Sequence, residues 1–308
     1  MPLDPQVSAL LAQFEGRPTL DTLPVAVGRR AYAETTAKMV PRPAGELAVD
    51  ERLLPGPAGP MRARVYRPAA PGAGRPLVVY LHGGGWVVCD LDTHDALCRR
   101  LSLGADAVVV SIDYRLAPEH RFPTAADDAW AALRWLAANA GALGLGAQPP
   151  AVGGDSAGAT LAAVCAIKAR DAGLPLALQL LITPGTTAHQ DTASHKLFAQ
   201  GFLLDAAAID WFFDHYCPHA HRRDWRFAPL EAPDLEGVAP ACVVLAECDP
   251  LVDEGIAYAD RLRASGVPVQ LELYRGLTHD FIKMGRVLKE AGQAQQAAAD
   301  ALKEAWNR

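Results

Sequence analysis

Short apolar runs alternate with helix-period segments along most of this chain of 308 residues. Four runs have strand length and are apolar almost throughout, at residues 76–81, 107–112, 176–183 and 241–246. Such runs are typical of strands that are buried on both faces of a parallel sheet. Because helix-period segments separate them, the sequence predicts an α/β fold with a mostly parallel, doubly wound sheet. Ligands in such sheets bind at the carboxyl ends of the strands.

A tight turn between a predicted strand and a predicted helix carries the pattern G-x-S-x-G, as Gly154-Asp155-Ser156-Ala157-Gly158. Small flanking residues let the backbone bend sharply and hold the serine exposed at the top of a sheet. The N-terminus of the following helix favours developing negative charge. An ordinary glycine-rich turn has the same pattern, so the interpretation of Ser156 as a nucleophile depends on the surrounding segments.

Three consecutive glycines, residues 83–85, follow the predicted strand at residues 76–81. Glycines at a strand end leave backbone N–H groups without side-chain cover, as an oxyanion hole requires. The alternative is a flexible turn that binds nothing. We predict an oxyanion hole formed by the N–H groups of Gly83, Gly84 and Ala157.

A serine hydroxyl becomes a nucleophile when a base removes its proton, and a neutral histidine suits that role. His279 is the candidate, because it lies in a short loop between a late strand and the C-terminal helix. A carboxylate should orient that imidazole, and Asp249, which follows the preceding strand, is best placed. Asp253, Glu254 and Glu247 are the alternatives. The chain order of serine, aspartate and histidine is the one associated with α/β-hydrolases.

As a set, these residues resemble the hormone-sensitive-lipase-like group of α/β-hydrolase carboxylesterases, also called bacterial family IV. The resemblance covers about residues 46–308, and its motifs are His82-Gly83-Gly84-Gly85-Trp86, residues 113–120, Phe122-Pro123, residues 154–158, Asp249-Pro250-Leu251 with Asp253-Glu254, and His279 before Phe281. It implies an α/β-hydrolase fold and no metal or organic cofactor. The chain departs from the family at Ala159, where glycine is common, and at Trp86, where phenylalanine is frequent, and both departures should affect pocket size.

The resemblance also implies a helical cap over the pocket. Its first part is the N-terminal arm, residues 1–45, whose apolar residues at helical spacing already indicate a packed, lid-like segment. Its second part is an insertion after the sixth strand, residues 185–230, which is rich in histidine and aromatic residues. The α/β-hydrolase core then consists of residues 46–184 and 231–308.

Composition excludes several classes of function. The net charge is −6, with 29 basic and 35 acidic residues, so no strong positive field is available to attract nucleic acid or an anionic membrane. No apolar run approaches the roughly 20 residues of a membrane span, and the N-terminus lacks the pattern of a signal peptide. The six cysteines are scattered without CxxC pairs, which indicates reduced, mostly buried thiols and a cytoplasmic protein.

A second kind of site requires consideration in the insertion. His215, Cys217, His219 and His221 have side chains that bind metals, but their crowding near a helix end is irregular for a tetrahedral site. We therefore predict no metal.

The sequence predicts a cytoplasmic serine carboxylesterase that forms an acyl-enzyme and takes a small ester with a short to medium acyl chain. Trp86 and Asp155 are assigned to the substrate pocket, although hydrogen bonding within the turn competes for Asp155, and Asp280 is expected to face solvent or the loop backbone. An amidase, lactonase or deacetylase would use the same triad. A non-catalytic binding protein is disfavoured, because His279 is present. The resemblance further implies a homodimer that pairs through the last strand, residues 267–274.

Overall fold

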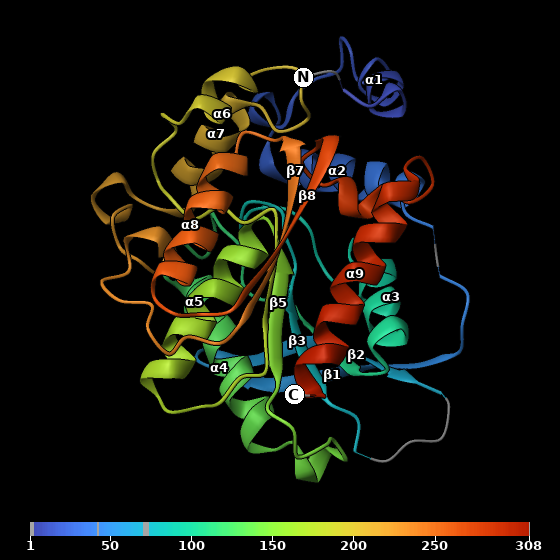
Figure 1. The fold of residues 1–308 in the computed structure, drawn as a ribbon. Helices are drawn as coiled ribbons and strands as arrows, with labels where there is room; N and C mark the ends of the chain where they lie inside the picture. The colour runs from blue at the N-terminus through green and yellow to red at the C-terminus, as the bar shows by residue number, and fades with distance from the viewer. Residues whose placement is uncertain (1–2, 42, 70–73, 308) are drawn as a thin grey trace.

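A computed structural model describes residues 3–41, 43–69 and 74–307 of the protein (Figure 1). Residues 1–2, 42, 70–73 and 308, which belong to the predicted core and cap ranges, lie outside the described residues. The strands form one eight-stranded sheet in the order β1-β2-β4-β3-β5-β6-β7-β8. They are β1 (Leu47–Gly56), β2 (Gly59–Pro68), β3 (Leu77–Leu81), β4 (Val108–Ile112), β5 (Ala151–Asp155), β6 (Gln179–Ile182), β7 (Ala241–Cys248) and β8 (Val269–Thr278).

The direction of the strands confirms the predicted mostly parallel sheet. β2 is antiparallel to its neighbours β1 and β4, and all pairs of adjacent strands from β4 through β3 to β8 are parallel. Parallel strands end at the same edge of a sheet, so β3, β5, β7 and β8 deliver the segments that follow them to one place. The predicted glycine loop, nucleophile, acid and base follow these four strands.

Helices cover both faces of the sheet (Figure 1). One face carries α3 (Asp95–Ala105) and α9 (Lys289–Trp306), which pack together, and the other face carries α4 (Thr124–Ala138), α5 (Ala157–Asp171) and α8 (Val252–Ala264). Among the residues that the structure describes, no helix has both the length and the apolar character to cross a membrane.

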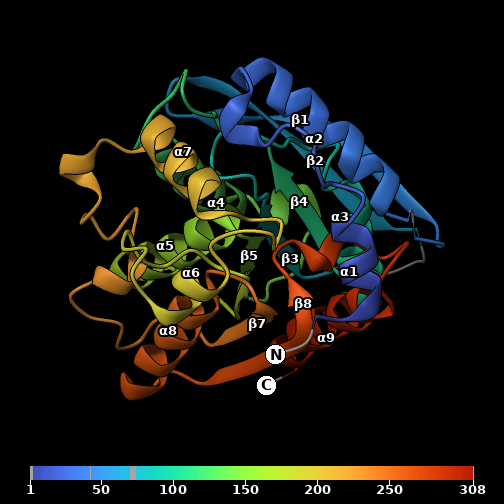
Figure 2. The same cartoon turned by 90° about the horizontal axis from the view of Figure 1, so that it is seen from above.

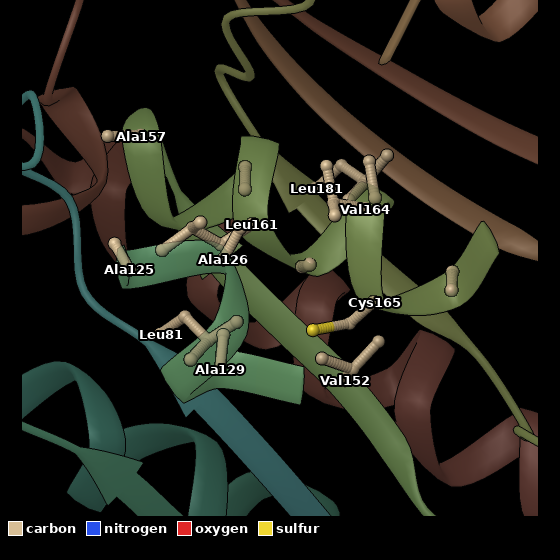
Figure 3. Packing of buried hydrophobic residues seen from close by; sticks show 14 of the residues in the cluster. Leu81, Ala125, Ala126, Ala129, Val152, Ala157, Leu161, Val164, Cys165 and Leu181 are labelled. Carbon is tan, nitrogen blue, oxygen red and sulfur yellow. The ribbon is translucent and has the colours of Figure 1, made fainter. Parts of the chain in front are cut away.

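The helix α5 is buried on almost all sides, because most of its residues are small or apolar around the whole circumference. Figure 3 shows Leu161, Val164 and Cys165 of this helix packed over Val152 of β5 and Leu181 of β6. All five side chains are fully buried. This packing fixes the start of α5, where the predicted nucleophile lies, against the centre of the sheet.

A layer of helices lies beyond the carboxyl ends of the strands (Figure 1), and seen from above it surrounds β3 and β5 (Figure 2). Its helices are α1 (Pro5–Leu11), α2 (Val25–Met39), α6 (Ala193–Leu197) and α7 (Ala206–Tyr216). They come from the two segments in which a cap is predicted. The sequence pattern predicts one amphipathic helix over residues 203–216, but α7 starts at Ala206, because Leu203 has a φ of 75°, outside the right-handed helical region.

The three prolines among residues 55–60 predict a loop between two strands, and the structure corrects this prediction. β1 and β2 pair through this segment, with Pro55 opposite Pro60 and Gly56 opposite Gly59. Hydrogen-bonded pairs alternate with non-hydrogen-bonded pairs in an antiparallel ladder. Because the glycine pair closes a two-residue turn, the prolines occupy the next pair, where the ladder needs no N–H group.

The packing beneath α5 yields a test of the fold. Leu181 is fully buried, so Leu181→Ala should lower the free energy of unfolding by about 2–5 kcal/mol through lost burial and a cavity. Leu53 is 67% exposed, so Leu53→Ala should change the free energy of unfolding by no more than about 0.5 kcal/mol. Urea denaturation followed by circular dichroism measures both. Equal effects of the two variants would contradict the described core.

Candidate active site

The serine of the G-x-S-x-G turn has a strained backbone that only close packing can hold. Ser156 joins β5 to α5 with a φ of 52°, in the left-handed region. A Cβ atom on Gly158 would lie 2.0 Å from the carbonyl oxygen of Leu81 in β3, so a side chain is excluded there. The turn therefore rests directly on the backbone of β3, with Ser156 at the N-terminus of α5.

The predicted triad residues meet at this turn. His279 Nε2 lies 2.9 Å from Ser156 Oγ, and His279 Nδ1 lies 2.7 Å from Asp249 Oδ2. The other oxygen of Asp249 accepts a hydrogen bond from the backbone N–H of Leu251 at 2.9 Å. Asp249 and His279 are 1% and 5% exposed, so bulk water competes little with these contacts. The geometry is that of a nucleophile, a base and an orienting carboxylate.

The electrostatics of His279 follow from this geometry. Burial lowers the pKa of its imidazole, but the charge and the hydrogen bond of Asp249 raise it more, so the net pKa lies above the ordinary value of 6.5. The adjacent Asp280 raises the pKa further, and Lys283 opposes that effect.

The alternative acids have other partners. Asp253 Oδ2 accepts a hydrogen bond from the backbone N–H of Ser194 at 2.8 Å. Glu254 is buried and lies 3.1 Å from His195 Nε2. Glu247 accepts a hydrogen bond from a backbone N–H of β8 at 2.8 Å. Of the four carboxylates considered, the structure brings Asp249 to the imidazole of His279.

The structure corrects two assignments that involve Asp155. The N–H of Gly83 donates to Asp155 Oδ1 at 3.2 Å, so it is not available to an oxyanion. Asp155 is fully buried beneath the turn, where it also accepts a hydrogen bond from the Tyr80 hydroxyl at 2.8 Å and lies 3.0 Å from His94 Nε2. Burial raises the pKa of its carboxyl, but His94, Lys283 and these hydrogen bonds hold it well below the usual range. Its role is hydrogen bonding beneath the turn, and it does not line the pocket.

The glycine that the sequence prediction missed is Gly85. Gly84, Gly85 and Ala157 line the cavity that contains Ser156. In the described part of the chain, their three N–H groups have no protein acceptor. A Cβ atom on Gly85 would lie 2.2 Å from the ring of Phe212, so only glycine lets α7 lie against this loop. The candidate oxyanion hole includes Gly85 in place of the predicted Gly83, because the buried Asp155 carboxylate binds the N–H of Gly83. The sequence pattern does not reveal where that carboxylate lies.

The cavity has a volume of about 570 Å³ and a mostly apolar lining. Its walls include side chains of α2 and α7, from the two predicted parts of the cap, together with Ser156 and His279. Trp86 lines it as predicted and stacks on Tyr216 at 4.6 Å between ring centroids. Ala159 is fully buried within α5 and does not line the cavity, so the expected effect of this departure on the pocket is not seen.

A polar cluster interrupts the apolar lining. Asp280, expected to face solvent or the loop backbone, instead accepts a hydrogen bond from the Tyr32 hydroxyl and lies 3.1 Å from Lys283 Nζ. All three residues line the cavity. Sequence reasoning missed Tyr32 and Lys283, because a tyrosine in the arm and a lysine near the C-terminal helix become neighbours only in the folded chain.

The cysteines and histidines complete the comparison with the predictions. All six cysteines are free and buried, as predicted. His215 Nδ1 lies 2.8 Å from the carbonyl oxygen of Trp211, and the side chain of His219 is 82% exposed. Among the described residues, no group of three or more histidine, cysteine or acidic side chains could hold a metal ion.

Comparison with known proteins places this site in a family. Residues 78–283 match the family described as the alpha/beta hydrolase fold. The chain belongs to the α/β-hydrolase family. It is 39% identical to the ethyl acetate hydrolase of Pseudomonas putida, over 99% of each protein. It is 41% identical to a carboxylesterase of Mycobacterium tuberculosis, over 98% of this chain and 96% of the relative.

A solved structure shows the same architecture. An ester hydrolase from the metagenome of Lake Arreo superposes with a TM-score of 0.95 at 42% identity, over 99% of this chain and all of the other. That hydrolase was solved in complex with a derivative of bipyridine phosphonate. The predicted α/β-hydrolase fold and the resemblance to hormone-sensitive-lipase-like carboxylesterases are thereby confirmed.

The titration of His279 can be measured without choosing a substrate. Only the neutral imidazole accepts the proton of Ser156, so phosphonylation of this serine by a fluorophosphonate should slow as the pH falls through a midpoint above 6.5. Asp249→Asn should move that midpoint to lower pH, because the charge that raises the pKa is gone. The rate is measured by mass spectrometry across the pH range.

The matched control is His219→Asn, since that exposed imidazole lies outside the cavity. It should leave the midpoint unchanged. A wild-type midpoint below 6.5, or one that Asp249→Asn does not lower, would contradict the assignment of His279 as the titrating base.

Proposed function

We propose that this carboxylesterase hydrolyses its substrates through an acyl-enzyme on Ser156, with His279 as base and acid and Asp249 as the orienting carboxylate. The observation that carries the proposal is the continuous hydrogen-bonded geometry from Ser156 Oγ through both nitrogens of His279 to Asp249. The esterase relatives match this chain over nearly its whole length, which supports the same reaction.

The reaction has two balanced halves. Ser156 Oγ attacks the ester carbonyl carbon and its proton moves to His279 Nε2, while Asp249 stabilises the imidazolium. The tetrahedral intermediate collapses, and the departing alkoxide takes the proton from His279 and leaves as the alcohol. A water molecule then attacks the acyl carbon, gives its proton to His279, and releases the acid as that proton returns to Ser156.

The negative oxygen of each tetrahedral intermediate would bind the N–H groups of Gly84, Gly85 and Ala157. These groups line the cavity next to Ser156, and Ala157 also contributes the positive end of α5. Loss of one such donor typically costs about 2.7–4 kcal/mol of transition-state stabilisation. The phosphonate bound by the Lake Arreo relative supports this role, since a tetrahedral phosphorus resembles the tetrahedral intermediate.

The cavity favours small, largely apolar esters with short to medium acyl chains. Its volume of about 570 Å³ lies within the range of roughly 300–1,000 Å³ that is typical of small-molecule sites. The predicted segments 1–45 and 185–230 act as the cap, because side chains from the described part of each segment form walls of the cavity. The relative from Pseudomonas putida is named for a small ester, ethyl acetate.

Two further properties belong to the proposal. The free, buried thiols are compatible with action in the reducing cytoplasm. β8 lies at one edge of the sheet, where a second copy of the chain could add a strand and form the predicted homodimer. No feature of the site favours an amide, a lactone or an acetylated amine over a simple ester.

Removal of the nucleophile tests the reaction. Ser156→Ala should lower kcat for p-nitrophenyl acetate and butanoate by at least about 10⁴-fold, because the acyl-enzyme cannot form. Ser265→Ala, at the end of α8 and outside the cavity, is the matched control and should retain wild-type rates. If the wild type hydrolyses p-nitroanilides but no ester, the protein is an amidase with the same triad and the proposed esterase activity is wrong. If it hydrolyses neither, the proposed function is wrong.

Chain-length preference tests the cavity. Phe212 lines the cavity and lies against the glycine loop, so Phe212→Ala should enlarge the space beside the scissile bond. The ratio of kcat/KM for the octanoyl ester to that for the acetyl ester should rise at least about 10-fold. Trp211→Ala, on the same helix but outside the lining, should leave the ratio unchanged. An unchanged ratio in both variants would show that α7 does not limit the acyl chain.

A further inference from the structure

A lysine that the reaction does not use is buried at the centre of the active site. Lys283 lies in a short 3-10 helix (Phe281–Lys283) that follows β8, and its side chain is only 4% exposed. A buried ammonium group costs several kcal/mol of desolvation unless charged and hydrogen-bonding partners compensate it. The partners of Lys283 should therefore explain why the chain retains a lysine here.

The partners are the residues next to the nucleophile and next to the base. Lys283 Nζ lies 3.1 Å from Asp280 Oδ1, and Asp280 directly follows His279. The same nitrogen lies 3.7 Å from Asp155 Oδ2, and Asp155 directly precedes Ser156. One cation thus spans two carboxylates from chain segments more than a hundred positions apart in sequence.

The third partner comes from the arm. Lys283 Nζ donates to the Tyr32 hydroxyl at 3.1 Å, and that hydroxyl donates to Asp280. Burial and the charge of Asp280 raise the pKa of Tyr32, so the phenol keeps its proton and remains a donor. The contact attaches α2 to the loop that carries His279.

The backbone around Asp280 needs such support. Asp280 has a φ of 65°, a left-handed conformation that is uncommon for a residue with a side chain. Its side chain is held by Lys283 and Tyr32, and in the 3-10 helix that follows, the carbonyl oxygen of Ile282 accepts a hydrogen bond from Gln295 of α9 at 2.7 Å. The orientation of His279 therefore depends on a turn whose side-chain partners converge on Lys283.

We propose that Lys283 is a positioning residue for catalysis. By binding both Asp280, which follows His279, and Asp155, which precedes Ser156, it keeps the base aligned with the nucleophile. The inference rests on the proposed function, because it concerns the same triad. It adds a residue that acts on the triad through Asp280 and Asp155, the neighbours of His279 and Ser156 in the chain.

The charges around His279 predict the direction in which its pKa changes when one of them is removed. Asp249, Asp280 and Lys283 act on the pKa of His279, the two carboxylates raising it and Lys283 lowering it. Lys283 itself faces Asp280, Tyr32, Asp155 and Cys89, and His94 contacts the same oxygen of Asp155, Oδ2, at 3.0 Å. Loss of the ammonium group leaves the carboxylates uncompensated, so the pKa of His279 should rise. Loss of the Asp280 charge should lower it.

The test measures kcat and KM for p-nitrophenyl butanoate against pH. In Lys283→Met, kcat should fall by about 10²-fold with a smaller change in KM, and the acidic midpoint should move to higher pH. In Asp280→Asn the midpoint should move to lower pH, and the double variant should lie between them. Lys289→Met, whose side chain is 80% exposed in the wild type, is the matched control and should retain the wild-type profile.

The control for folding is the fraction of each protein preparation in which Ser156 reacts with a fluorophosphonate. This fraction counts the folded active sites. If the variants lose activity only in proportion to that fraction, or all midpoints coincide, Lys283 is merely structural and the proposal is overturned. If the wild type labels with the fluorophosphonate but hydrolyses no ester, the proposed function fails. In that case the labelling rate against pH in the same variants still tests Lys283, with the same opposite shifts expected.

Discussion

The close approach of the nucleophile turn to β3 is the constraint on which the site depends. Gly158 leaves no room for a side chain between α5 and the carbonyl oxygen of Leu81. β3 ends at Leu81 and leads through His82 into the glycine loop, so the strained Ser156 and the N–H groups of Gly84 and Gly85 line the same cavity. The buried packing of α5 on the sheet holds this strain, as strained backbone persists only where its surroundings fix it.

Buried charge connects this turn to the rest of the reaction centre. Asp155 lies below the serine, Asp280 lies beside the histidine, and Lys283 lies within 4 Å of both carboxylates. Each ionised group would be costly alone, so the cluster is retained as a unit. The arm takes part at two places, since Tyr32 contacts Asp280 and Arg29 donates to the carbonyl oxygen of Val87 at 2.7 Å, just after the glycine loop. The arm is thus in direct contact with the loops that follow β3 and β8.

Much of the fold and of the triad follows from sequence, because both depend on local order along the chain. Continuous apolar runs identify buried parallel strands, and the residues that follow them meet at one edge. This reasoning predicts that Ser156, Asp249 and His279 lie together, and their side chains do meet in the structure. It failed where a role depends on contacts across the fold: Gly83 was chosen over Gly85, and Asp155 was placed in the pocket, because nothing local reveals where a buried carboxylate points.

The sequence alone determined the class of fold, the chemistry of the nucleophile and base, and the family, since short motifs and their order along the chain indicate all three. Only the tertiary structure decided which backbone N–H groups are free, which side chains line the cavity, and that Tyr32 and Lys283 belong to the site. The physical reason is that hydrogen-bond partners and burial depend on neighbours far apart in the chain. Lys283 and Tyr32 lie 251 residues apart in sequence and 3.1 Å apart in space.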